Sequence, residues 1–316
     1  MHIVVADDLP APAIQLLRDE GWSVDATTGR APAALHAALR DAAALIVRSA
    51  TRVDAAVIAA APKLRAIARA GAGVDNIDLA AAAARGVVVM NAPGATSISV
   101  AELTLGLLLA LVRQLPAADR ALKSGQWVKP AAAGSELCGK TIGIVGFGRI
   151  GRIVGRLCAA FGMTVIAHDP YVAAAEAGGE ALLVSLDELC ARADVISLHL
   201  PASATTHHLF DATRLARCRR GVRLVNTSRG VLVDEAALLA ALESGQVGGA
   251  GLDVFAAEPP IDWALARHPA VVATPHLAAS TREAQERVGI ETAAAVRDFL
   301  RDGRISNPVV ATPWSR

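Results

Sequence analysis

The chain has 316 residues, of which 53% are hydrophobic and 19% charged, and its formal net charge is +1. This length suits two ordinary domains, each with its own core. A nearly balanced charge gives no electrostatic basis for binding nucleic acid or an anionic membrane, so neither is expected as a partner.

In the first third of the chain, short β-branched runs alternate with alanine-rich runs, which predicts an α/β fold with parallel sheets. Strands are expected at residues 3–6, 45–48, 66–69 and 87–90. Asn91-Ala92-Pro93-Gly94 interrupts this pattern. One long helix is then predicted from Ser97, a candidate N-cap, to Ala121.

A second α/β run follows this helix and extends to about residue 274. Its expected strands are residues 141–145, 164–168, 195–199, 223–226, 249–252 and 271–273. The tail, residues 283–300, is predicted to form one amphipathic helix.

The four cysteines are widely spaced and form no Cys-x-x-Cys pair. We interpret them as buried thiols in a reducing cytoplasm, and we expect neither disulfides nor a bound metal. The first residues resemble a strand rather than a signal peptide. The most apolar stretch, residues 103–112, is too short to span a bilayer. A cytoplasmic protein is therefore expected.

A glycine motif follows the expected strand 141–145 and reads Gly146-Phe147-Gly148-Arg149-Ile150-Gly151. The first glycine permits a tight turn, the second lets the backbone approach a pyrophosphate, and the third permits close packing of helix on strand. Asp169 ends the next strand, eighteen residues after Gly151. A carboxylate there would bind the adenosine ribose and repel a 2′-phosphate, so we predict a dinucleotide site for NAD rather than NADP.

Residues 134–141 also match the P-loop expression Gly-x4-Gly-Lys-Thr. A P-loop follows a strand and precedes a helix, whereas this segment follows an irregular stretch and leads into an expected strand. ATP hydrolysis is therefore not predicted.

Three further residues are candidates for chemistry. Arg229 lies in Asn-Thr-Ser-Arg-Gly, just after an expected strand, and a guanidinium there can hold a carboxylate bidentately. His276 lies eighteen positions after Glu258, and an imidazole beside a carboxylate can exchange protons near neutral pH. Singly, each could be structural or a solvated surface residue. Together with the dinucleotide motif, they indicate hydride transfer.

The order of these motifs resembles the D-2-hydroxyacid dehydrogenase family. The glycine motif and its downstream Asp are followed by Ser-Arg-Gly, Leu-Asp-Val-Phe-x-x-Glu-Pro and Pro-His. Residues 45–51, 69–76, 91–97 and 274–285 extend the likeness over nearly the whole chain. Within the family, the pattern is most similar to the subfamily that oxidises 3-phosphoglycerate, in a short form without a C-terminal regulatory domain. No feedback inhibition by serine is therefore expected.

The resemblance implies two Rossmann-like domains with parallel sheets and an active-site cleft between them. Residues 1–92, completed by 287–316, would form the substrate domain, and residues 93–286 the inserted NAD domain. The resemblance also implies a homodimer formed through the NAD domain, to which the loop containing Trp127 would contribute.

The resemblance also implies a role for each site residue. Arg229 would hold the substrate carboxylate, His276 would remove the C2 hydroxyl proton, and Glu258 would support the imidazolium. The implied cofactor-binding residues are Gly146, Gly148, Arg149, Ile150, Gly151, Asp169, Leu200, Pro201, Thr227, Ser228, Asp253 and Ala278. The implied substrate-binding residues, besides Arg229, are Arg48, Ser49 and Arg69 around a phosphate, and Gly73 and Val74 at the carboxylate.

Three positions depart from the subfamily pattern. Ala72 replaces a threonine, Ala278 replaces a glycine, and Lys129 stands where an arginine crosses from the partner subunit. Two alternatives therefore stay open: a glyoxylate or hydroxypyruvate reductase of the same family, and an NAD-sensing, corepressor-like binding protein. The basic and polar anchors Arg48, Ser49 and Arg69 favour a phosphorylated substrate.

Overall fold

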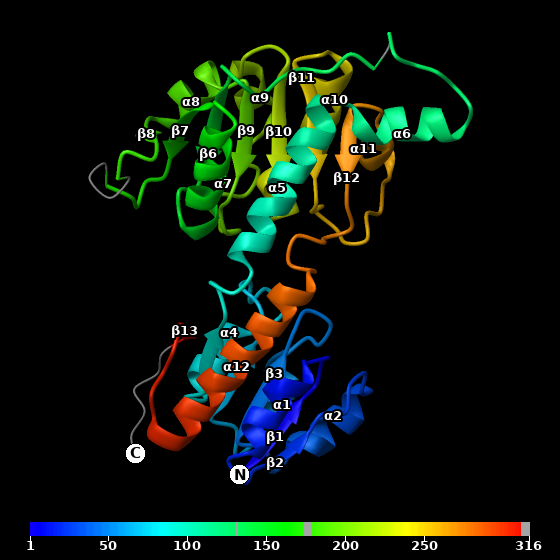
Figure 1. The fold of residues 1–316 in the computed structure, drawn as a ribbon. Helices are drawn as coiled ribbons and strands as arrows, with labels where there is room; N and C mark the ends of the chain where they lie inside the picture. Colours follow the sequence, from blue (N-terminus) through cyan, green and yellow to red (C-terminus); the bar gives the residue numbers. More distant parts are fainter. Residues whose placement is uncertain (131, 174–177, 311–316) are drawn as a thin grey trace. The chain divides into compact units, whose positions relative to one another are not determined.

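A computed structural model describes residues 1–130, 132–173 and 178–310 (Figure 1). The chain forms two compact units. Unit 1 comprises Met1–Thr96 and the segment from Ser280 onward, and unit 2 comprises Ser97–Ala279. The chain thus passes between the units after residues 96 and 279, whereas the sequence-based boundaries lie after residues 92 and 286. The helix that starts at Arg282 belongs to unit 1 because its apolar face packs into the core of that unit.

Unit 1 is built on a six-stranded sheet in the order β13-β5-β4-β3-β1-β2. All its strand pairs are parallel except β13 with β5. The strands are β1 (His2–Val5), β2 (Ser23–Asp25), β3 (Ala44–Val47), β4 (Ala66–Arg69), β5 (Val88–Asn91) and β13 (Pro308–Val310). Its helices are α1 (Ala11–Arg18), α2 (Pro32–Leu39), α3 (Ala55–Ala59), α4 (Leu79–Ala84) and α12 (Arg282–Asp302). The four expected strands are confirmed, and β2 and β13 are additions at the sheet edges.

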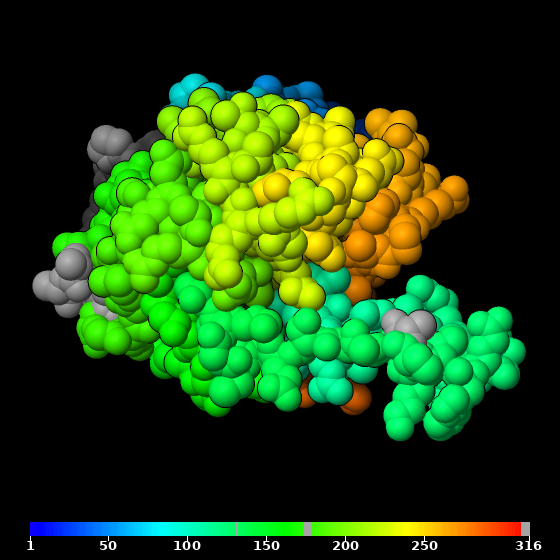
Figure 2. Space-filling model, turned by 90° about the horizontal axis from the view of Figure 1, so that it is seen from above, coloured from blue at the N-terminus to red at the C-terminus, as the bar shows by residue number. Residues whose placement is uncertain are grey.

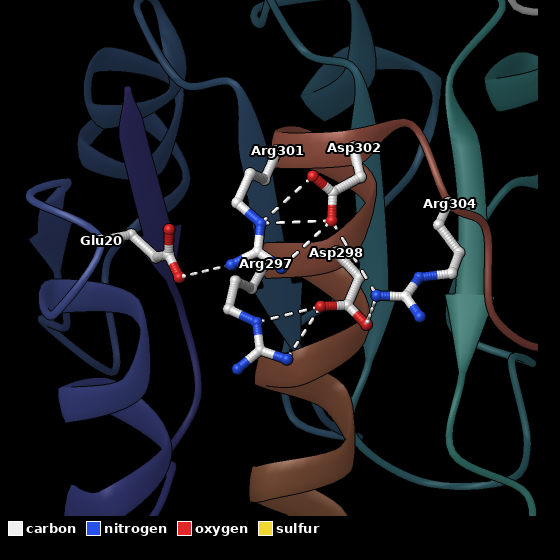
Figure 3. A network of polar contacts seen from close by, with 6 residues as sticks. All are labelled: Glu20, Arg297, Asp298, Arg301, Asp302 and Arg304. Atoms are coloured by element: carbon white, nitrogen blue, oxygen red, sulfur yellow. Dashed lines mark hydrogen bonds and ion pairs between the residues drawn. The ribbon is translucent and has the colours of Figure 1, made fainter.

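Helix α12 confirms the amphipathic helix expected for the tail. Thr281 caps its start by accepting a hydrogen bond from the Ala284 amide at 3.2 Å, and Gly303 ends it in a left-handed conformation. Val288, Val296 and Phe299 are buried. The last turns carry a network of ion pairs, which Figure 3 shows. It joins Glu20, Arg297, Asp298, Arg301, Asp302 and Arg304.

Unit 2 is built on a seven-stranded sheet in the order β12-β11-β10-β9-β6-β7-β8, and all its strand pairs are parallel. The strands are β6 (Thr141–Val145), β7 (Thr164–His168), β8 (Leu182–Leu183), β9 (Val195–Leu198), β10 (Val222–Asn226), β11 (Val247–Leu252) and β12 (Val271–Ala273). Its helices are α5 (Ser97–Val112), α6 (Leu115–Lys123), α7 (Arg149–Ala160), α8 (Leu186–Arg192), α9 (Ala212–Arg217), α10 (Glu235–Glu243) and α11 (Ala264–Arg267). Side chains of α5 and α7 join one core cluster, and those of α8, α9 and α10 join another.

The prediction of a single helix over residues 97–121 is wrong. Helix α5 ends at Val112, Gln114 adopts a left-handed φ of 53°, and α6 begins at Leu115. The cause is Pro116, which has no N–H to donate to the carbonyl four residues before it. That carbonyl, of Val112, accepts instead from the Ser135 amide at 2.8 Å. In the space-filling view, the region of α6 projects at one side of unit 2 (Figure 2).

The cysteines are only partly as expected. Cys158, Cys190 and Cys218 are buried, and burial raises the pKa of the Cys158 thiol to about 12. Cys138 is exposed, against expectation, because it lies in the irregular stretch before β6.

In the described part of the chain, no single helix is long and apolar enough to cross a bilayer. Helices α5 and α6 reach that length and apolar character only when taken together, and the chain bends by 62° at the break between them.

Candidate active site

The glycine motif connects β6 to α7, where the order of the sheet reverses between β6 and β9. Gly146 has a φ of 93°, and a Cβ on it would lie 2.4 Å from the His199 carbonyl oxygen. A Cβ on Gly151 would lie 2.2 Å from the Gly146 oxygen. Gly148 caps α7, is exposed, and faces open space. The first and third glycines thus permit the local packing, while the second leaves a helix N-terminus open to an anion.

Asp169 follows β7 and is bound to the glycine motif. Its Oδ2 accepts from the Phe147 amide at 2.9 Å, and its Oδ1 accepts from the Tyr171 amide at 2.9 Å. Arg149, exposed, and Ile150 begin α7. The half-buried Leu200 follows β9 and is followed by Pro201. The residues expected to bind the adenosine and pyrophosphate therefore gather at the carboxyl edge of one sheet, at its reversal point, where doubly wound folds bind ligands.

A turn at the end of β10 carries Arg229, and Asn226 holds this turn. Asn226 is buried; its Nδ2 donates to the Arg229 carbonyl at 2.8 Å, and its Oδ1 accepts from the Ser228 amide at 3.0 Å. Ser228 Oγ donates to the Leu198 carbonyl at 2.7 Å, and Thr227 Oγ1 shares a hydrogen bond with Thr104 Oγ1 at 2.8 Å. The sequence motif contained Asn226, but its supporting role is visible only in the fold.

The Glu258–His276 pair predicted from the sequence is formed. His276 Nδ1 lies 2.6 Å from Glu258 Oε2, and Glu258 Oε1 accepts from the Phe255 amide at 3.2 Å. The two side chains are 49% and 38% exposed, so a ligand can reach them. Because the carboxylate engages Nδ1, Nε2 is the nitrogen that remains for exchanging a proton.

His276 adopts a left-handed φ of 54°, which is uncommon for a residue with a Cβ and recurs at functional sites. Asp253 holds this conformation. It is fully buried, its carbonyl accepts from the His276 amide at 2.8 Å, and its carboxylate accepts from Thr274 Oγ1 at 2.6 Å. The same carboxylate accepts from the amides of Leu277 and Ala278 at 2.7 and 2.9 Å. Asp253, expected at the nicotinamide, is therefore also the support of the His276 turn, with Thr274 as a partner that the sequence did not reveal.

An apolar cavity of about 440 Å³ adjoins the pair within unit 2. Glu258 and His276 line this cavity, together with Phe255 and Trp263.

The residues expected at a substrate phosphate lie in unit 1. Strands β3 and β4 are paired with Val47 opposite Arg69, so Arg48 and Arg69 emerge at the same sheet edge. Ser49 is exposed, and the two arginines are half-buried. Gly71, with a φ of 152°, leaves room for Arg69, because a Cβ there would lie 1.6 Å from Arg69 Nη1. The loop continues through Gly73 and Val74, both half-buried. The structure thus gathers the expected residues in two groups, one on each unit.

A doubly wound unit with a glycine-rich dinucleotide motif at its reversal point defines the class of dinucleotide-binding proteins. The chain belongs to the D-isomer specific 2-hydroxyacid dehydrogenases: the family described as "D-isomer specific 2-hydroxyacid dehydrogenase, NAD binding domain" matches residues 105–278. Both the family and the NAD cofactor expected from the sequence are confirmed.

Similar proteins agree with this membership. The chain is 49% identical to D-3-phosphoglycerate dehydrogenase of Mycobacterium tuberculosis, over 99% of the chain and 61% of that protein. It is 45% identical to D-3-phosphoglycerate dehydrogenase of Methanocaldococcus jannaschii, over 99% of the chain and 60% of that protein. The chain therefore spans about 60% of the length of these relatives.

Solved structures agree as well. The TT0316 protein from Thermus thermophilus has a TM-score of 0.89 at 38% identity, covering 98% of this chain and all of its own. A glyoxylate reductase from Paecilomyes thermophila has a TM-score of 0.91 at 31% identity, with 98% coverage of both chains.

Proposed function

We propose that the protein oxidises 3-phosphoglycerate to 3-phosphohydroxypyruvate with NAD as the hydride acceptor. The observation that carries the reaction is the 2.6 Å contact between His276 and Glu258, in the same unit as a dinucleotide motif. The pair of arginines at the ends of β3 and β4, together with the identity to the D-3-phosphoglycerate dehydrogenases, supports the phosphorylated substrate. In this proposal unit 1 binds the substrate phosphate, and unit 2 binds NAD and carries Arg229 and the acid–base pair.

The chain's residues fit this cofactor. Gly148 leaves the start of α7 open for the pyrophosphate, with Arg149 and Ile150 in the first turn, and Asp169 offers a carboxylate for the ribose. Leu200, Pro201, Thr227, Ser228, Asp253 and Ala278 complete the proposed cofactor residues. When bound, NAD accepts the hydride from C2 of the substrate.

The remaining steps belong to the side chains. Arg229 binds the substrate carboxylate and C2 oxygen, with Gly73 and Val74 as backbone donors. His276 Nε2 takes the proton of the C2 hydroxyl as the C2–H bond breaks, which leaves a ketone. Glu258 stabilises the imidazolium that forms. Arg48, Ser49 and Arg69 bind the phosphate at C3.

A panel of 2-hydroxy and 2-keto acids, assayed with NAD and NADP, tests the proposal. We expect 3-phosphoglycerate with NAD to give the highest kcat/KM, well above D-glycerate. Reduction of glyoxylate without any turnover of 3-phosphoglycerate would show that the protein is instead a reductase, the function that the glyoxylate reductase structure favours. A chain inactive on every acid that still binds NADH would favour the corepressor-like alternative.

We also propose a homodimer formed through unit 2. Leu115 and Leu122 on α6 and the nearby Trp127 are 53%, 60% and 79% exposed, which is unusual for large apolar side chains. Light scattering of the purified protein should give twice the chain mass, and Trp127→Ser should shift it toward the monomer. The cytoplasmic location expected from the sequence is kept as part of this proposal.

A further inference from the structure

The sheet of unit 1 has its own reversal point, between β1 and β3. From there β2 lies on one side and β4, β5 and β13 on the other. Doubly wound sheets of this order bind ligands outside the carboxyl ends of the two strands that flank the reversal. In this chain, the segments at those ends contain Asp7, after β1, and Arg48, after β3.

Asp7 holds the turn formed by residues 48–51. The side chain is buried, with 7% exposure. Its Oδ2 accepts from the Arg48 amide at 2.5 Å and from the Thr51 amide at 3.2 Å, and its Oδ1 accepts from Thr51 Oγ1 at 2.5 Å. Both ends of the turn are thus tied to one carboxylate, while Ser49 and Ala50 between them are exposed.

Asn76 holds the same turn through its carbonyl groups. Its Nδ2 donates to the Arg48 carbonyl at 2.7 Å and to the Thr51 carbonyl at 2.6 Å. The amide and the carboxylate therefore bind complementary backbone groups of the same two residues. This arrangement is specific at Asn76, because a carboxylate there would set acceptors against the two carbonyl oxygens.

We propose that Asp7 and Asn76 are positioning residues for recognition of the substrate phosphate. They bind no substrate themselves; they hold the 48–51 turn so that the Arg48 side chain and the exposed residues of the turn are aligned with the phosphate before it binds. A site that is already ordered avoids the entropic cost of ordering a loop on binding, which raises affinity without a new contact. The inference rests on the proposed function, since it assigns the phosphate to this turn.

The test is Asp7→Asn, with Asp8→Asn as the matched control. Asp8 is exposed and adjacent, so both variants lose the same charge at nearly the same place. Replacing the charged acceptor by a neutral amide oxygen weakens its hydrogen bonds to the Arg48 and Thr51 amides, which corresponds to a KM for 3-phosphoglycerate that is about tenfold higher. In Asp7→Asn we expect kcat, the KM for NAD and kcat/KM for D-glycerate to change by less than about twofold. The control Asp8→Asn should match the wild type in all of these constants.

Inorganic phosphate, as a competitive inhibitor against 3-phosphoglycerate, provides a second measurement. Its inhibition constant should rise in Asp7→Asn by the same factor as the KM. If Asp7→Asn does not fold, Thr51→Val removes the hydroxyl bond to the same carboxylate, and we expect a rise of about threefold. Thr51→Ser keeps the hydroxyl and should retain most of the affinity for 3-phosphoglycerate.

Two results would overturn the inference. One is an unchanged KM for 3-phosphoglycerate in the folded variants; the other is an equal loss for 3-phosphoglycerate and D-glycerate, which would indicate a scaffold role. A failure of the proposed function looks different: the wild type would then show no preference for 3-phosphoglycerate over D-glycerate. Phosphate inhibition that is equal in wild type and variant would still count against the positioning role in that case.

Discussion

Gly230 lies directly against the backbone of Phe255: a Cβ on Gly230 would fall 1.9 Å from the Phe255 carbonyl carbon and 2.2 Å from its oxygen. This contact joins two loops of unit 2 that carry different parts of the proposed chemistry. Arg229 precedes Gly230 in one loop, and Phe255 donates its amide to Glu258 in the other. The absence of a side chain at position 230 therefore sets how closely the arginine turn approaches the acid–base loop.

Gly230→Ala should force these two loops apart, because the atoms in the way are backbone atoms that cannot rotate aside. We expect kcat/KM to fall by about a hundredfold or more, with a smaller effect on NADH affinity. Gly106→Ala is the control, since a Cβ there meets nothing within 4 Å on helix α5, and it should raise stability by about 0.5–1 kcal/mol. Steady-state kinetics measures the activity of the two variants, and thermal unfolding measures their stability. A Gly230→Ala enzyme with wild-type kinetics would show that activity tolerates the separation of the loops.

His276→Ala and Glu258→Gln separate the two members of the acid–base pair. Removing the imidazole should lower kcat by roughly 10²–10⁴, and the amide at 258, which cannot support an imidazolium, should cost less. NADH binding, followed by fluorescence, should stay near the wild-type value in both, because Asp253 rather than His276 holds the turn. Loss of NADH affinity in His276→Ala would assign the residue a structural role instead.

Asp169→Asn tests the choice of cofactor. The amide oxygen can still accept from the Phe147 amide, so the glycine motif should stay in place while the negative charge is lost. Without that charge the site repels a 2′-phosphate less, and the ratio of kcat/KM for NAD over NADP should fall by about tenfold. The check is kinetics with both cofactors at fixed ionic strength. An unchanged ratio would remove the role given to Asp169.

Burial lowers the pKa of His199 from its ordinary value of 6.5 to about 3. Its Nδ1 is enclosed and has no hydrogen-bond partner within the described residues, while Nε2 lies 2.9 Å from Ser197 Oγ. In the unfolded chain His199 is therefore protonated below pH 6.5, whereas in the folded chain it stays neutral until about pH 3. Above pH 6.5 the imidazole is neutral in both states, and His199 does not reduce stability. As the pH falls below 6.5, the free energy of unfolding decreases by at most about 1.4 kcal/mol per pH unit because of this residue.

His199→Asn removes this titration. Urea unfolding between pH 7.5 and 4.5, followed by circular dichroism, should show the free energy of unfolding of the wild type falling more steeply with acid than that of the variant. Carboxylates elsewhere affect both proteins alike and cancel in the comparison. Parallel curves would contradict the buried, neutral state of His199.

Local patterns were sufficient for the central strands but not for the sheet edges. The run Thr141–Val145 is β-branched and apolar, and it forms β6. Ser23–Asp25 and Pro308–Val310 were not predicted, because three residues with polar or proline character become strands only when a neighbouring strand pairs with them. The break before α6 was foreseeable from Pro116, but the apolar, alanine-rich surroundings concealed it.

The site divides in the same way. Motifs predicted the residues that the proposed chemistry requires, such as Gly146, Arg229 and His276, because each stands in a short recognisable string. Their supports were not predicted: Asp7 reaches Arg48 across 41 residues, and Asp253 reaches Thr274 across 21. Contacts over such separations depend on how strands are ordered in a sheet, and that order is not encoded in any local run of residues.

The burial of Asp253 has a consequence for how this protein can diverge. One enclosed carboxylate accepts from Thr274, Leu277 and Ala278, so an amide in its place would turn a donor toward donors. We therefore expect substitutions of Asp253 to be poorly tolerated. Ser49 and Ala50, by contrast, are exposed in a turn that other residues hold. If that turn binds the substrate phosphate, as proposed, a descendant or an engineer can change the accepted acid there and leave the proposed proton-transfer residues as they are.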